Sequence, residues 1–342
     1  MDWLRSIPSF TDVTTVVVVD GGGTGSRAAV ATAEGEVLGY ARGGPTNSRS
    51  AGDDDAAENL RAVIAAALAD AARPLSPTAV LVSSASVDTQ AHADVLAGGV
   101  RKVVPGPATI SVVADTIGCW AATADLDPAV AVIAGTGSAV LAGALDQGSR
   151  RYGGWDYVLG DEGSGYALGR AALREVLLVG EGRSDGTALA AAVCGRLGID
   201  ETDELFDLIY KPEVDKAEIA AFATDVLELA GEGDARSEAI VEEQVRLLAD
   251  AVAAAFRDFT GLHTLGCFGG LWNVPIYRTR FGRAVKVATG RQPTLVYPGD
   301  VAMAGSFRLV LRHGPGGGAG AAEDAAVDRF EAGLLRAKES HA

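Results

Sequence analysis

The sequence predicts an α/β protein made of two lobes, and three observations support this. Its 342 residues correspond to about two domains at ~100–200 residues each. An apolar content of 48% is enough to build a full core and argues against intrinsic disorder. The tetrapeptide Gly-Thr-Gly-Ser occurs twice, at 23–26 and at 135–138, each time between two apolar segments that read as strands.

The first of these turns follows a strand of four consecutive valines, Val16–Val19, and begins after Asp20. Its glycines allow a tight turn and a close approach to a ligand. Successive backbone N–H groups in such a turn form a concavity that suits phosphate oxygens. Residues 27–32 resume an extended pattern, so the unit is strand, turn, strand. This order disfavours a dinucleotide fingerprint, which needs a helix after the turn, and a P-loop, which needs Lys-Ser/Thr there.

The second turn has the same order of strand, glycine turn and strand, within residues 129–142. A glycine turn alone is a weak signal, because many such turns are plain hairpins. One phosphate-binding hairpin in each half of the chain suggests two lobes that close on a nucleotide.

Residues 1–14, before the first turn, are predicted as a loosely held leader. Between the two turns, strands and helices alternate, with strands predicted at 78–83 and 109–114. Helices are predicted at 56–72, 90–98 (stopped by Gly98-Gly99) and 117–124. Asp115 stands where a strand ends, which is where α/β sheets place ligands. It is a candidate for chemistry or a cap of the following helix. Asn47 is a turn residue or a hydrogen-bond partner of a polar substrate.

The segment 151–165 contains five glycines and cannot form a regular element. Trp155, Tyr157 and the carboxylates Asp156, Asp161 and Glu162 lie together in it. An aromatic face beside carboxylates suits a sugar, because the ring stacks on C–H groups and the carboxylates accept hydroxyl hydrogen bonds. The alternative is a rigid loop whose Trp is in the core and whose Asp161 caps a helix at 164–178.

Amphipathic helices at 187–197, 203–210, 216–230 and 237–259 are expected to wrap the second lobe. A short strand at 265–268 leads into Gly269-Gly270, a turn that allows close approach of a nucleoside. A further helix begins after Tyr297, a glycine-rich linker covers 313–320, and a last helix at 321–338 could return to the first lobe.

Charge and cysteine content exclude several classes of function. A net charge of −16 argues against nucleic acid or an anionic membrane as partner. An acidic chain that handles a nucleotide usually needs Mg²⁺ as intermediary. The three cysteines are far apart, which indicates no zinc site, disulfide scaffold or redox pair. No secretion signal or spanning apolar run is apparent, so a soluble, cytoplasmic protein is expected.

These motifs together resemble the actin/hexokinase/Hsp70-like ATPase superfamily, and most closely the N-acetylglucosamine kinase family, grouped with BadF/BadG/BcrA/BcrD-type ATPases. The resemblance runs from about Val16 to Phe307 and rests on 20–24, 134–138 and 153–165. It implies two ribonuclease H-like (actin-like ATPase) lobes with a cleft for nucleotide and sugar. The first would cover 1–116, to which 321–342 could return, and the second would cover 117–320.

The resemblance also implies roles for individual residues. Asp20 would hold Mg²⁺, mainly through water, and Asp115 would be the general base. ATP phosphates would lie on Gly22, Gly23 and Thr24 and on Thr136 and Gly137, with the nucleoside against Ala230 and Gly270. The sugar would contact Asn47, Asp115, Gly154, Trp155, Asp156 and Asp161.

The implied activity is an ATP-dependent amino-sugar kinase that phosphorylates the C6 hydroxyl of N-acetylglucosamine, glucosamine or a related amino sugar, in a protein that could be a homodimer. Two alternatives remain open: an ATPase activator of a radical dehydratase, and a non-catalytic sugar sensor. Three departures from the family pattern bear on the substrate. They are Asp156 where glycine is common, the glycine-free stretch Ser83–Ser86, and Ser306 after Gly305. The carboxylate of Asp156 could favour a cationic, free amino sugar.

Overall fold

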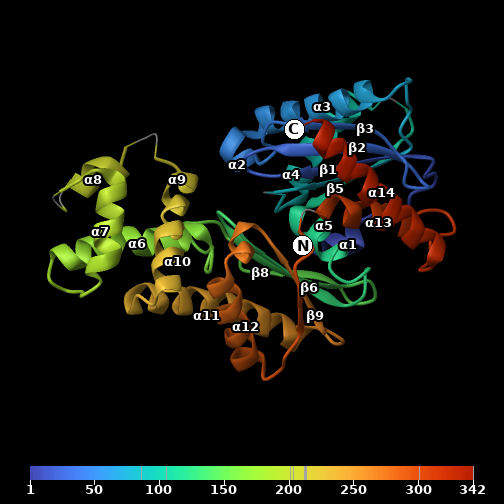
Figure 1. Cartoon of the computed structure of the whole chain (residues 1–342). Helices are drawn as coiled ribbons and strands as arrows, with labels where there is room; N and C mark the ends of the chain where they lie inside the picture. The colour runs from blue at the N-terminus through green and yellow to red at the C-terminus, as the bar shows by residue number, and fades with distance from the viewer. Residues whose placement is uncertain are drawn as a thin grey trace. The chain divides into compact units, whose positions relative to one another are not determined.

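The computed structural model describes residues 1–85, 87–104, 106–200, 202, 204–211, 214–299 and 301–341, with the backbone alone at 49 and 50 (Figure 1). Contacts divide the chain into two compact α/β units. Unit 1 is Met1–Ala129, Gly143–Arg150 and Asp300–Ala342, and unit 2 is Val130–Ala142 and Arg151–Gly299. This division differs from the predicted boundary at 116/117, because 117–129 and 300–320 lie in unit 1. The last predicted helix also lies in unit 1.

The first sheet has five strands in the order β3-β2-β1-β4-β5. They are β1 (Thr15–Gly21), β2 (Ser26–Thr32), β3 (Val37–Gly43), β4 (Ala79–Ser84) and β5 (Thr109–Ala114). β2 runs antiparallel to both β1 and β3, while β4 runs parallel to both of its neighbours, β1 and β5. The side chains of Val16–Val19 are fully buried, as expected for a central strand covered on both faces.

The second sheet has the order β10-β9-β6-β7-β8. Its strands are β6 (Ala129–Ala134), β7 (Ser138–Ala144), β8 (Gly148–Tyr152), β9 (Thr264–Phe268) and β10 (Thr294–Val296). In chain order this is the strand order of the first sheet: the first strand is central, the second and third lie on one side of it, and the fourth and fifth lie on the other. Each Gly-Thr-Gly-Ser joins the first strand of its sheet to the second. The repeat in the sequence is therefore a repeat of the fold.

Helices of unit 1 pack on its sheet and on one another. They are α1 (Trp3–Ser6), α2 (Ser48–Ala51), α3 (Asp53–Asp70), α4 (Gln90–Arg101), α5 (Asp115–Ala121), α13 (Ala302–Arg312) and α14 (Ala321–Ser340). α3 contacts β2 and β3, α13 contacts β1 and α5, and α14 contacts β3 (Figure 1). The chain's last helices thus complete the unit that its first strand begins.

Helices of unit 2 gather around α6 and α11. They are α6 (Gly165–Gly180), α7 (Thr187–Leu197), α8 (Glu204–Ile209), α9 (Lys216–Ala221), α10 (Ala223–Glu232), α11 (Ala235–Asp258), α12 (Pro275–Thr289) and the 3₁₀ turn η1 (Gly270–Asn273). The helix predicted at 216–230 is divided at Phe222, whose ring is buried. None of the described helices is long and apolar enough to span a bilayer.

The prediction of a loose leader was wrong. Trp3, Leu4, Ile7 and Phe10 are all buried, and the Phe10 amide donates to the His313 carbonyl at 2.9 Å. Four large apolar side chains within ten residues were the signal that indicates a docked segment. The N-terminal residues are part of the core of unit 1.

The predicted helix stop at Gly98-Gly99 was also wrong, because α4 continues to Arg101. A Cβ atom on Gly99 would lie 2.8 Å from the carbonyl oxygen of Ala57 in α3. The glycine therefore permits close packing of two helices.

A glycine of the same kind joins α6 to α9, and we expect Gly169→Ala to lower the free energy of unfolding by about 1–3 kcal/mol. The added methyl group would stand 1.9 Å from the Ile219 carbonyl oxygen, so α9 would have to move away. Urea unfolding measures the effect. Gly195→Ala in α7 is the matched control, since nothing lies within 4 Å of its Cβ position. Equal stability of the two variants would contradict the prediction.

Candidate functional site

The first glycine turn is held tightly at the end of β1. The Gly22 amide donates to the Gly25 carbonyl at 2.8 Å, and the Thr46 amide donates to the Gly22 carbonyl at 3.2 Å. Gly23 and Thr24 are exposed at the tip, where a ligand can reach their backbone. The Asn47 amide nitrogen lies 3.7 Å from the Cβ position of Gly23. The predicted phosphate turn and Asn47 are thus neighbours.

Two carboxylates stand at the carboxyl edge of the same sheet. Asp20 is in register with Ser83 of β4, which is in register with Val113 of β5. Asp115 follows two residues later, so the two carboxylates are two strands apart, about 10 Å across the sheet. This edge is the ligand-binding edge of parallel α/β sheets.

The surroundings of the two carboxylates differ. Asp20 forms an ion pair with Arg27, its cross-strand neighbour on β2. Asp115 Oδ1 accepts from the Thr116 amide at 2.7 Å. The alternative that Asp115 caps the helix is not what the structure has, because the N-cap of α5 is Ala114 and Asp115 is its first residue.

The second glycine turn is fixed to the start of α6. The Gly135 amide donates to the Gly137 carbonyl at 2.9 Å, and two amides of α6 donate back to the turn. These run from Gly165 to Gly135 at 2.7 Å and from Tyr166 to Thr136 at 3.1 Å. Thr136 remains exposed at the tip. The turn is thereby rigid and reachable, as phosphate binding requires.

A cluster of two carboxylates and one ammonium lies against this turn. Asp161 is 2% exposed and accepts from the Ser138 amide at 3.2 Å. Lys216 Nζ is 2.5 Å from Asp161 Oδ2 and 2.6 Å from Asp156 Oδ1. The Cβ position of Gly137 is 2.9 Å from the same Nζ. Unit 2 therefore brings two predicted sugar-binding residues and one predicted phosphate-binding residue together.

Lys216 was missed by the sequence analysis. Burial lowers the pKa of its ammonium, but the hydrogen bond to Asp156 and the interactions with Asp161 outweigh this, and the pKa lies above its ordinary value. The signal was present in the sequence: Asp215 and Glu218 form a capping box at the start of α9. A lysine in the first turn then opposes the helix dipole, which indicates that its charge serves something else.

The loop from 153 to 163 holds its shape through left-handed backbone conformations. Asp156 and Asp161 have φ of 65° and 66°, which Asp tolerates better than most residues. Trp155 is 61% exposed, with the Arg151 guanidinium 4.9 Å from its ring centroid. The alternative of a core Trp is therefore wrong. Asp161 is not the cap of α6 either, because Ser164 is.

The predicted nucleoside residues lie in different settings. The Gly270 amide nitrogen is 3.9 Å from the Cβ position of Gly135, which places it beside the second turn. Gly269 allows this approach, since its φ is +105° and a Cβ there would be 2.4 Å from the Ala134 carbonyl oxygen. Ala230 is 1% exposed within α10, and its role at the nucleoside stays a prediction.

Two departures from the family pattern meet in unit 1. The hydroxyls of Ser83 and Ser306 lie 2.9 Å apart and both side chains are buried. Ser84 pairs with the Thr46 hydroxyl at 2.8 Å, which fixes the residue before Asn47. These serines therefore support the sheet edge by hydrogen bonds. Ser86, the last residue of the glycine-free stretch, lies outside the described residues.

Cysteine placement bears on the radical-dehydratase alternative. Cys119 and Cys267 are buried, and burial raises the pKa of the Cys267 thiol to about 12. Among the described residues, no group of three His, Cys, Asp or Glu is arranged to hold a metal. An iron–sulfur cluster shared across a dimer needs exposed thiolates from each subunit. Neither buried thiol meets that requirement.

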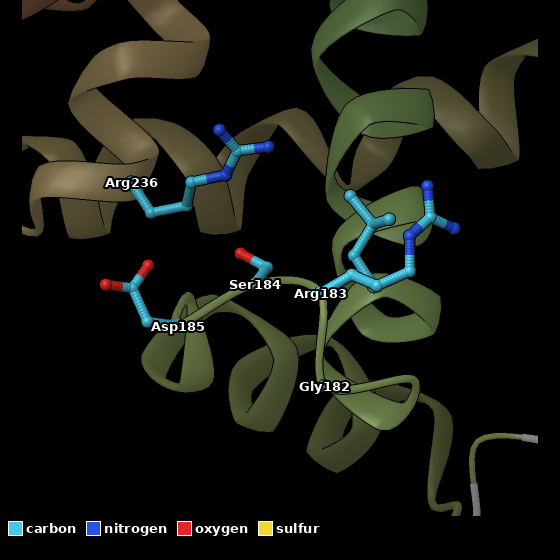
Figure 2. Close-up of a pocket in the computed structure, with 6 residues that line it drawn as sticks. Gly182, Arg183, Ser184, Asp185 and Arg236 are labelled. Atoms are coloured by element: carbon cyan, nitrogen blue, oxygen red, sulfur yellow. The ribbon is translucent and has the colours of Figure 1, made fainter.

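Unit 2 also contains a cavity of about 540 Å³ lined by Leu178, Gly182, Arg183, Ser184, Asp185 and Arg236 (Figure 2). It includes none of the predicted site residues. Arg236 Nε pairs with buried Glu175 at 2.8 Å, and Arg183 pairs with Glu181 at 2.5 Å. In Figure 2 the two guanidinium groups do not converge on one point. Both arginines therefore have structural partners.

The chain matches a known protein family and is similar to named kinases. The BadF/BadG/BcrA/BcrD ATPase family model matches residues 17–305. The chain belongs to this family. A relative in Clostridium acetobutylicum, an N-acetylmuramic acid/N-acetylglucosamine kinase, is 28% identical over 240 residues, which are 70% of this chain and 78% of the relative. An N-acetyl-D-glucosamine kinase of Dictyostelium discoideum is 30% identical over 129 residues, 37% of this chain and 40% of the relative.

Solved structures agree on the fold. A Chromobacterium violaceum protein assigned as an N-acetylglucosamine kinase superposes with a TM-score of 0.71 at 24% identity, over 87% of this chain and 99% of the other. A ROK family glucokinase from Streptomyces griseus, solved with glucose and AMPPNP, gives a TM-score of 0.51 at 17% identity. The match covers 86% of this chain and 98% of the glucokinase. The mixed α/β fold with two five-stranded sheets is thus that of this group of sugar kinases, as the resemblance implied.

Proposed function

We propose that the protein is an ATP-dependent kinase that transfers the γ-phosphoryl group of ATP to the C6 hydroxyl of an amino sugar. The observation that carries the proposal is in unit 1: Asp115 stands at the same sheet edge as the exposed glycine turn that follows Asp20. Phosphoryl transfer needs a phosphate cradle and a group that accepts the hydroxyl proton, and this edge offers both. Membership of an ATPase family and the kinase relatives support the same reaction.

The two turns are suited to the phosphates of ATP. Their tips at Thr24 and Thr136 are exposed, and their backbones are fixed by the hydrogen bonds described above. We assign Gly22, Gly23 and Thr24 of unit 1 and Thr136 and Gly137 of unit 2 to this role.

Asp20 fits a hydrated Mg²⁺ better than a directly bound one. Its Oδ2 is engaged by Arg27, so Oδ1 is the oxygen that could hold a water of the hydrated ion. Mg²⁺ keeps several waters in most nucleotide sites. When bound, it would neutralise charge on the phosphates.

Asp115 accepts the proton of the C6 hydroxyl as that oxygen attacks the γ-phosphorus in line. The bond from the γ-phosphorus to the bridging oxygen breaks, ADP leaves with that electron pair, and the sugar 6-phosphate is formed. The Thr116 amide donates to Asp115 Oδ1, which holds the carboxylate in one orientation. A positioned base of this kind contributes about 10²–10⁴-fold.

For the sugar itself we assign Asn47, Gly154, Trp155, Asp156 and Asp161. The exposed face of Trp155 offers a stacking surface, and carboxylates accept hydrogen bonds from hydroxyl groups.

ADP release with ATP and Mg²⁺ across a panel of neutral sugars, N-acetylated amino sugars and free amino sugars tests the proposal. We expect at least one amino sugar to raise ADP release well above the rate without sugar, and a sugar 6-phosphate to appear in equal amount. Sugar binding without turnover would replace the proposal by the sensor alternative.

A further inference from the structure

The carboxylate pair of the sugar loop already has a cation. Asp156 and Asp161 carry two negative charges, and Lys216 supplies one positive charge within 2.6 Å of an oxygen of each. An ammonium group is also what distinguishes a free amino sugar from its N-acylated form at neutral pH. The chain thus places its own ammonium where the sequence alone suggested that a substrate ammonium would bind.

We propose that Lys216 is a specificity-determining residue that occupies the position of a substrate cation, so that the site accepts a sugar with an uncharged nitrogen substituent and discriminates against the protonated free amino sugar. The inference rests on the proposed function, because it concerns the sugar site of that kinase. It reverses the expectation that Asp156 alone gave, namely a preference for a cationic sugar.

Lys216 is held in place by its surroundings. The capping box of Asp215 and Glu218 fixes the first turn of α9, and Gly169 lets that helix approach α6 closely. The ring centroid of Tyr157 lies 5.8 Å from Nζ. A substrate ammonium would have to displace a well-anchored group or stand beside a like charge, and both are unfavourable.

The stability of α9 does not explain why a lysine stands at position 216. A lysine in the first turn of a helix is destabilising, because its charge faces the positive end of the dipole. Residues that break a local rule are expected at functional sites. Nζ lies 2.9 Å from the Cβ position of Gly137, so the charge stands beside both the predicted sugar residues and the predicted phosphate turn.

The test compares kcat/KM for N-acetylglucosamine and for glucosamine, at a pH where glucosamine is protonated, in wild type, Lys216→Gln, Lys216→Arg and Lys211→Gln. We expect the wild type to favour the acetylated sugar by about tenfold or more. Lys216→Gln is expected to lower that ratio at least tenfold, chiefly through a smaller KM for glucosamine. Lys216→Arg keeps the charge and is expected to keep the preference.

Lys211→Gln is the matched control, since Lys211 is exposed and lies in the bend after α8, five residues before Lys216. Its ratio is expected to equal that of the wild type. A second measurement needs no variant: wild-type KM should be smaller for uncharged glucose than for protonated glucosamine.

Each outcome has a separate meaning. A wild type that prefers protonated glucosamine, or an active Lys216→Gln whose ratio is unchanged, overturns the inference and leaves the kinase intact. A wild type whose ADP release no sugar stimulates overturns the proposed function, and the inference with it.

Discussion

Asp115→Asn is expected to lower kcat by about 10²–10⁴-fold with little change in the affinity for ATP. The amide keeps the size of the carboxylate and can still accept from the Thr116 amide, so the start of α5 is preserved. It cannot take the proton of the attacking hydroxyl. The loss should therefore fall on the chemical step, as measured by ADP release at saturating sugar and by nucleotide titration.

The control for this variant is Asp54→Asn, which removes an exposed carboxylate from the first turn of α3, another helix of unit 1. Its kcat is expected to match that of the wild type. A wild-type kcat in Asp115→Asn would remove Asp115 from the reaction. A loss confined to ATP affinity would move it to nucleotide binding.

Asp161→Asn is expected to weaken both stability and catalysis. The free energy of unfolding should fall by about 1.5–3 kcal/mol, the range for a hydrogen-bonded interaction with a charged group. Asp161 is 2% exposed and Asn tolerates its φ of 66°, so the change isolates the charge that faces Lys216. We expect kcat/KM for the sugar to fall about 10–100-fold, the ratio that corresponds to losing one hydrogen bond between a carboxylate and a sugar hydroxyl group.

Asp250→Asn on α11 is the comparison for Asp161→Asn. Its ion pair with Arg246 is also short, at 2.9 Å, but both side chains are more than half exposed. Exposed pairs contribute about 0–1 kcal/mol, so little change is expected. If the two variants lost equal stability in urea, the burial of Asp161 would not be the cause of its larger expected contribution to stability.

The stability difference between wild type and Asp161→Asn has a predictable pH dependence. Because the pKa of Lys216 is raised in the folded protein, its pairing contributes fully below the pKa of an unfolded lysine. The contribution is lost as pH rises through the pKa that Lys216 has in the folded protein. The difference should therefore be constant near neutral pH and shrink in the alkaline range.

Features encoded in short stretches of sequence were predictable. Four valines before a glycine turn specify a buried strand and its end, and β5 has the bounds that the sequence suggested. The duplicated tetrapeptide indicated two lobes, and in the structure each copy joins the first strand of its sheet to the second. The glycine-rich loop at 153–163 was predictable because no regular element accommodates so many glycines.

Features that depend on partners distant in sequence were not predictable. Gly99 reads as a helix stop until Ala57 is known to lie against it, and nothing in the sequence indicates that the Ser83 and Ser306 hydroxyls pair. Lys216 is 60 residues from Asp156, so only the tertiary fold brings them together. The roles of the predicted site residues stay predictions until the variants are measured.

The return of the chain to unit 1 has a consequence for how the protein is made. Unit 2 ends at Gly299, whereas unit 1 gains α13 and α14 only from the last forty or so residues. Phe307 and Phe330 are fully buried there, stacked 4.4 Å apart between ring centroids. During synthesis from the N-terminus, unit 1 begins before unit 2 and is completed after it. We expect a released chain that ends at Gly299 to protect unit 2 from protease, while the sheet that contains β1 is still cleaved.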